Sequence, residues 1–87
     1  MSKVVRRYAL EQITTKIIEL RQREQIYQAK YGLDYQTFAQ RTAEDEEFVT
    51  QIEATRTKLW EDDLLDWEFC YKGAQDWTHT LETMLLT

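Results

Sequence analysis

Apolar residues repeat at helical spacing through the first third of the chain. They fall at Leu10, Ile13, Ile17, Leu20, Tyr27 and Tyr31, and only Glu24 interrupts a spacing that alternates between three and four residues. This near-heptad period is typical of an amphipathic helix with a continuous apolar seam. It predicts a helix over residues 5–31, roughly 40 Å long at 1.5 Å per residue. Gly32 follows directly, where a glycine in the left-handed conformation commonly ends a helix.

A second seam of this kind runs along the end of the chain and predicts a helix over residues 60–86. Its positions are Trp60, Leu64, Trp67, Tyr71, Ala74, Trp77 or Thr78, Leu81, and Met84 or Leu85. Two shorter helices are expected between the seams, over 34–42 with Asp34 as its N-cap and over 44–57. Thr42 and Asp45 resemble a capping box for the latter. Whether this helix continues into the last one near Thr57 stays open.

The chain contains no proline, and its two glycines are Gly32 and Gly73. Few positions therefore interrupt a helix, which favours an all-α fold. Two long helices with apolar seams can bury those seams against each other. The expected architecture for the 87 residues is a single domain (1–87), an antiparallel helical hairpin whose two short helices cover one side.

Charge divides the sequence into a basic beginning and an acidic middle. The net charge is −5, but residues 1–30 carry seven Lys or Arg against three Asp or Glu, whereas residues 44–68 carry two against ten. Cys70 is the single cysteine, so no intramolecular disulfide can form. Because no apolar run is long enough for a signal peptide or a membrane span, we expect a cytoplasmic protein with no membrane partner.

Residues capable of catalysis or metal binding are few. Asp62 and Asp66 share a helical face, and Asp76 lies one turn before His79, but a di-iron bundle site requires further glutamates and a second histidine. One cysteine and one histidine cannot form a zinc ligand set. Cys70 and His79 are nine residues apart on one expected helix, about 13 Å along its axis. We therefore expect no catalytic residue, no metal and no cofactor, and a protein that is not an enzyme.

A nucleic-acid-binding role is an alternative. Residues 39–52 carry the small and apolar skeleton of a helix-turn-helix, but the helix that would enter the major groove begins with "EDEE", which phosphates repel. The basic first helix could instead contact phosphates. Its candidate residues are Arg6, Arg7, Arg21 and Arg23.

Eleven aromatic residues are unusual in a chain this short, and most lie on the predicted seams. Trp60, Phe69 and Trp77 cannot all face one side of a helix together with Trp67. Some aromatic surface should therefore stay exposed, and exposed aromatic rings bordered by charge are typical of protein-binding hot spots.

The string "QAKYGLDYQTFAQR", followed after an acidic stretch by "EDDLLDWEF", resembles a group of small acidic all-helical prokaryotic proteins. The similarity rests on Lys30, Tyr31, Gly32, Leu33, Tyr35 and Phe38, and on residues 63–66 with Trp67 and Glu68. Such proteins look like the antitoxins of two-gene modules, in which the second protein is a small basic toxin, often a ribonuclease. The resemblance implies a non-enzymatic neutraliser of a basic partner.

An acidic segment with exposed aromatic rings would attract a cationic protein and cover a phosphate-binding surface. The expected partner-binding residues are three apolar anchors and a charged rim: Trp60, Phe69 and Trp77, with Asp62, Asp63, Asp66 and Glu68. Two alternatives remain. One is a nucleic-acid-binding regulator, and the other is a structural protein that self-associates through its seams, for example as a homodimer.

Overall fold

The computed structural model describes residues 3–86 and contains four α-helices and no strand within that range. Their bounds are α1 Lys3–Tyr31, α2 Tyr35–Glu44, α3 Glu46–Thr55 and α4 Trp60–Leu86. The predicted all-α class is confirmed, and so are two long helices that pack together with two short ones between them. The predicted bounds of about 5–31, 34–42 and 44–57 differ from the observed ones by one or two residues at five of their six ends, and 60–86 agrees at both.

Local hydrogen bonds explain where the short helices begin and end. Asp34 and Asp45 are the N-caps of α2 and α3, because their carboxylates accept the backbone N–H groups of Thr37 and Phe48 at 2.8 and 3.1 Å. Thr42 is not a cap, as its hydroxyl donates to carbonyls inside α2. Gly32 has a φ of +71°, so it ends α1 in the left-handed conformation.

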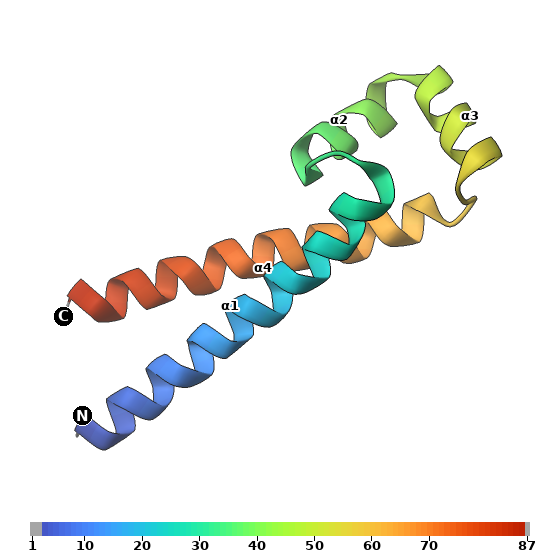
Figure 1. Cartoon of the computed structure of the whole chain (residues 1–87). Helices are drawn as coiled ribbons and strands as arrows, with labels where there is room; N and C mark the ends of the chain where they lie inside the picture. Colours follow the sequence, from blue (N-terminus) through green and yellow to red (C-terminus); the bar gives the residue numbers. More distant parts are fainter. Residues whose placement is uncertain (1–2, 87) are drawn as a thin grey trace.

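Helices α3 and α4 are separate elements, which answers the question that the sequence left open. Arg56 is the C-cap of α3, and its backbone N–H still donates to the Ile52 carbonyl at 2.8 Å. Thr57 follows, and its hydroxyl accepts the Leu59 N–H at 2.9 Å just before α4 begins. This short connection lets α3 turn away from the direction of α4 (Figure 1).

Helices α1 and α4 lie side by side with opposite chain directions, and both chain ends lie at the end of the molecule away from α2 and α3 (Figure 1). Arg6 donates to the Met84 carbonyl at one end, and Tyr31 donates to Asp63 at the other. The molecule is elongated, with extents of 55 × 19 × 17 Å and a radius of gyration of 16.8 Å. A compact chain of this length would have a radius of gyration of about 12 Å.

The larger of two core clusters lies at the end that carries α2 and α3, and a smaller one of Leu20, Cys70 and Ala74 lies between α1 and α4. We call residues 20–74 the head. Its main cluster consists of Tyr31, Phe38, Ile52 and Trp67, with Tyr27, Leu33, Tyr35, Phe48, Trp60 and Leu64 packed around it. The Trp67 ring stacks on Phe38 at a centroid distance of 5.3 Å and on Tyr27 at 5.6 Å. Its indole N–H has no acceptor among residues 3–86, so ring packing is what holds the tryptophan in place.

The remainder of α1 and α4 forms a two-helix stalk, which we define as residues 3–19 and 75–86. Ile13 is the only buried residue among them. Several of its apolar side chains face solvent, namely Val4, Tyr8, Ile18, Leu85 and Leu86. Two helices can bury only the stripe along which they touch, so the stalk lacks the third layer that α2 provides in the head.

Candidate interaction surface

Some of the acidic residues at the start of α4 stabilise the helix itself. Glu61, Asp62 and Asp63 occupy its first turn, where unpaired backbone N–H groups favour negative charge. The Asp62 side chain is exposed, whereas Asp63 is half-buried. Neighbouring carboxylates of this segment therefore differ in their exposure.

Asp63 and Asp66 face α1 and tie the two long helices together. The Lys30 ammonium and the Tyr31 hydroxyl both donate to Oδ2 of Asp63 at 2.6 Å. The Tyr27 hydroxyl donates to Oδ2 of Asp66 at 2.5 Å, and the Arg23 guanidinium donates to its Oδ1. Each carboxylate thus accepts one tyrosine and one cationic donor from α1.

These contacts shift the pKa values of the groups that make them. The Tyr27 hydroxyl, and after it Arg23, hold the pKa of Asp66 below its ordinary value, against the opposing effect of burial. Burial and then the hydrogen bonds to Asp66 and Asp63 raise the pKa values of Tyr27 and Tyr31. Asp66 therefore stays ionised and the tyrosines stay protonated near neutral pH, as these hydrogen bonds require.

An exposed apolar pair lies on the side of α4 that is not used for packing. The side chains of Leu65 and Phe69, one turn apart, are 64% and 62% exposed. They line a shallow hollow together with Glu68, Lys72, Gly73 and Asp76. Glu68 accepts from the Lys72 ammonium at 2.6 Å, so a charged pair borders the apolar floor. Exposed rings beside charged groups are the usual composition of a binding hot spot.

The structure brings only some of the seven expected partner-binding residues to this surface. Phe69 and Glu68 line the hollow, and Asp62 is exposed at the start of the same helix. Trp77 is 38% exposed and lies two turns beyond Phe69. Asp63 and Asp66 are engaged with α1.

Trp60 is half-buried: one side packs against the aromatic cluster, and its indole N–H donates to Glu53 at 2.9 Å. Leu65 was missed by the sequence reasoning. Its position one turn before Phe69, off the apolar seam in the same direction, is the signal that could have found it.

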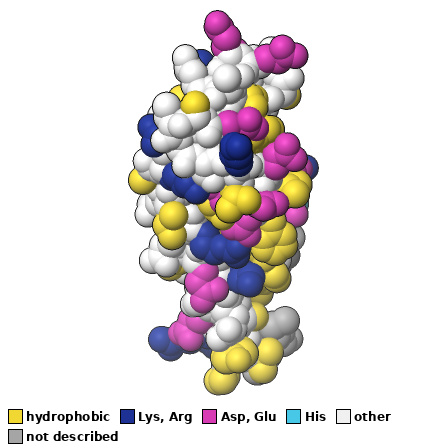
Figure 2. Space-filling model, turned by 90° about the vertical axis from the view of Figure 1, so that its right-hand side faces the viewer, with side chains coloured by type: hydrophobic (Ala, Val, Ile, Leu, Met, Phe, Trp, Pro, Cys, Tyr) yellow, Lys and Arg dark blue, Asp and Glu magenta, His cyan; other side chains and the backbone are white. Residues whose placement is uncertain are grey.

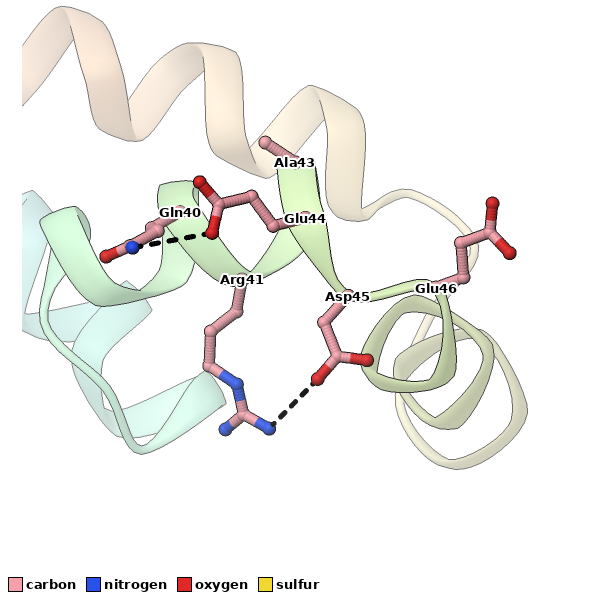
Figure 3. A pocket seen from close by; sticks show the side chains of 6 residues that line it. All are labelled: Gln40, Arg41, Ala43, Glu44, Asp45 and Glu46. Atoms are coloured by element: carbon pink, nitrogen blue, oxygen red, sulfur yellow. Dashed lines mark hydrogen bonds and ion pairs between the residues drawn. The ribbon is translucent and has the colours of Figure 1, made fainter.

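A second hollow lies at the junction of α2 and α3 (Figure 3). It is lined by Gln40, Arg41, Ala43, Glu44, Asp45 and Glu46. Arg41 lies 3.7 Å from Asp45, and Gln40 donates to Glu44 at 3.4 Å, so its polar groups pair along their own helix (Figure 3). Asp45 is also occupied as the cap of α3. The hollow is therefore a surface depression between two helix ends whose polar groups are already paired.

The four arginines considered for nucleic-acid binding all have acceptors within the chain. Arg6 donates to the Met84 carbonyl at 2.6 Å, and Arg7 pairs with Glu11 at 3.5 Å. Arg21 pairs with Glu24 at 2.8 Å, and Arg23 with Asp66. On the face shown in Figure 2, basic and acidic side chains lie interspersed. Of these four arginines only Arg23 pairs with the acidic middle of the sequence, and the face in Figure 2 shows no separate basic surface.

Groups that could support other chemistry lie apart from one another. Within residues 3–86 no three His, Cys, Asp or Glu side chains form a group that could hold a metal ion. Cys70 is fully buried, and burial raises the pKa of its thiol. No helix in the described part of the chain is long and apolar enough to cross a membrane. No protein-family model, curated protein or solved structure matches the chain.

Proposed function

We propose that the protein is a non-enzymatic interaction module that neutralises a basic, ribonuclease-like partner by occlusion, as the resemblance to antitoxins implies. The observation that carries the proposal is the exposed pair Leu65 and Phe69 on α4. A large apolar side chain that faces solvent in the middle of a helix adds nothing to the core. Its exposure is explained when a partner covers it.

Charges around the pair favour a cationic partner. Glu68 and Asp76 line the hollow, and Glu61 and Asp62 extend the acidic surface toward the start of α4. Lys72 is the one cation in the hollow, and it is already paired with Glu68. Acidic groups with no internal partner speed the encounter with a basic protein, and they repel acidic ones.

The opposed packing of α1 and α4 as an antiparallel hairpin would give this surface a rigid support. The ties of Asp63 and Asp66 to α1 fix the segment from which Leu65 and Phe69 project. A side chain presented by a rigid helix loses little conformational entropy on binding. The contacts of Asp63 and Asp66 with α1 thus support the interaction surface but are not part of it.

Affinity purification from the source organism tests the proposal. Wild type should retain a basic protein whose ribonuclease activity it inhibits when both are purified, and a Leu65→Ser/Phe69→Ser variant should retain at least tenfold less of it. Ile18→Ser removes a similarly exposed apolar side chain from α1 and serves as the matched control. Equal recovery with both variants, or a recovered protein that is acidic, would contradict the proposal.

Self-association is the second candidate, because one observation favours it. The shared end of α1 and α4 exposes Val4, Tyr8, Leu85 and Leu86, and packing this end against a second copy would bury them. Light scattering over a hundredfold concentration range would detect a dimer. A monomer at every concentration removes this candidate. No comparable observation favours nucleic-acid binding, for which the expected result is no retardation of DNA or RNA at about 50 mM salt.

A further inference from the structure

Glu24 is the only charged side chain buried among residues 3–86, with 4% of its surface exposed. It occupies the position on the apolar seam of α1 where the spacing calls for a hydrophobic residue. A buried carboxylate loses its hydration, and its internal partners seldom compensate in full. An apolar residue here would continue the seam and stabilise the packing of α1 on α4. Folding alone therefore does not explain the carboxylate.

A recessed pocket of about 160 Å³ opens beside Glu24, between α1, α2 and α4. Its lining includes Arg21, Asp34, Tyr35, Gln36 and Tyr71. The two tyrosine rings stack at 4.6 Å, and the Gln36 amide holds the Tyr71 hydroxyl at 2.8 Å. This ring contact and this hydrogen bond hold the two tyrosines in place in the pocket wall.

Charge and shape in the pocket suit a small organic cation. The lining contains two carboxylates and one guanidinium, that of Arg21. Glu24 is the buried carboxylate, whereas Asp34 is exposed and also caps α2. Arg21 reaches Oε2 of Glu24 from an exposed position, since 44% of its side chain is accessible. Oε1 of Glu24 has no donor from residues 3–86. Two tyrosines also line the pocket, and aromatic rings attract a cation that lies over a free face.

We infer that this pocket binds a side-chain-sized organic cation, a guanidinium or primary ammonium group, through the Glu24 carboxylate and the rings of Tyr35 and Tyr71. Its volume is below the 300–1,000 Å³ of pockets that hold whole drug-sized ligands. It therefore admits the tip of an arginine or lysine side chain or one end of a diamine. The inference does not depend on the proposed function, because the pocket shares no lining residue with the hollow of Phe69.

An NMR titration of the ¹⁵N-labelled protein at constant ionic strength tests this inference. The probes are N-acetyl-arginine amide, which represents a protein side chain, and putrescine, which represents a free amine; N-acetyl-leucine amide is the uncharged control. One or both cations should give saturable shifts of the amides near residues 24, 35 and 71. The expected dissociation constant is on the order of 10 mM, as suits so few ligand atoms. The cation that saturates at the lower concentration identifies the source.

Three variants make the result specific to Glu24. Glu24→Gln keeps the shape and removes the charge, so the cation affinity should fall at least tenfold, whereas Glu19→Gln on the exposed side of α1 should leave it unchanged. Glu24→Leu should abolish binding and raise the melting temperature, which would separate the loss of binding from unfolding. Shifts that stay linear with concentration, shifts that Glu24→Gln leaves unchanged, or equal shifts with the leucine probe would overturn the inference.

Discussion

Trp67 and Trp77 lie ten residues apart on α4, yet their surroundings differ completely. Trp67 in the head is fully buried, with rings from α1 and α2 stacked around it, whereas Trp77 in the stalk is 38% exposed. The two positions carry the same side chain on the same helix. What differs is the number of layers, because α2 lies across α1 and α4 only in the head (Figure 1).

This difference shows where the fold is stabilised. Apolar burial contributes roughly 25 cal/mol per Å² removed from water, so the ring cluster of the head supplies most of the favourable free energy. The stalk buries one residue fully and exposes many, and its ends are joined by the hydrogen bond from Arg6 to the Met84 carbonyl. We therefore expect the head to fold as the stable unit and the stalk to open more easily.

Replacing the two tryptophans gives the largest expected difference between the regions. Trp67→Ala should cost about 3–5 kcal/mol, because it removes a ring that fills the core. Small domains are stable by only about 5–15 kcal/mol, so this variant should lose a large fraction of its free energy of unfolding. Trp77→Ala should cost about 1 kcal/mol or less. Urea unfolding followed by circular dichroism measures both, and similar losses for the two variants would contradict the comparison.

Removing the hydrogen bonds and ion pairs between α1 and α4 in the head should cause the next largest loss in the free energy of unfolding. Asp66→Ala removes the acceptor of both Tyr27 and Arg23, at an expected cost of about 1–2 kcal/mol. Asp62→Ala removes an exposed carboxylate of the same helix and should leave the free energy of unfolding near the wild-type value. Comparing the two variants separates the effect of the contacts of Asp66 with α1 from the effect of negative charge at the start of the helix. Equal losses in the same urea experiment would show that the contacts of Asp66 with α1 do not stabilise the fold.

The contact of Asp66 with Tyr27 and Arg23 should also have a smaller effect on how stability depends on pH. The folded-state pKa of Asp66 lies below its unfolded value, so its contribution is complete above the ordinary aspartate pKa of about 3.9 and is lost as the pH falls through the folded value. Between pH 5 and pH 3, wild type should therefore lose more stability than Asp66→Asn. Parallel curves of unfolding free energy against pH would show that Asp66 gains nothing from Tyr27 and Arg23.

Gly73, at the boundary with the stalk, should show the smallest change. A Cβ atom there would lie 3.2 Å from Cδ1 of Leu20, which is tight but involves the end of a side chain. Alanine favours a helix over glycine by about 1 kcal/mol, and this gain offsets the crowding. Gly73→Ala should therefore shift the melting temperature by only a few degrees, and Gly73→Leu should lower it clearly. Equal effects of both substitutions would show that Leu20 can move aside freely.

The sequence predicted the helices well because their signals are local. The seam of residues 60–86, the cap Asp34 and the glycine after Tyr31 all act within a few residues of themselves. The start of α3 was predicted less well, because Thr42 was expected as its cap and Asp45 is the residue that caps it. The sequence could also show that some aromatic rings must be exposed. It could not show that Trp60 packs against the aromatic cluster while Leu65 faces solvent, since that depends on where α2 and α3 lie against α4.

The acidic segment was harder to interpret for the same reason. Five carboxylates between Trp60 and Phe69 suggested one charged surface, but two of them, Asp63 and Asp66, bond across to α1. Their tyrosine and cationic partners lie more than thirty residues away in the sequence. The burial of Glu24 could not be predicted either, because an interruption of the apolar seam does not distinguish an exposed glutamate from a buried one.

Native-state hydrogen exchange followed by NMR tests most directly whether the head is the stable unit. Amides that are hydrogen-bonded in the middle of the head, around Tyr27 and Trp67, should exchange only through global unfolding. Those of the stalk, within residues 7–15 and 78–85, should exchange at least a hundredfold faster through local opening. Uniform protection along α1 and α4, or slower exchange in the stalk than in the head, would contradict this account.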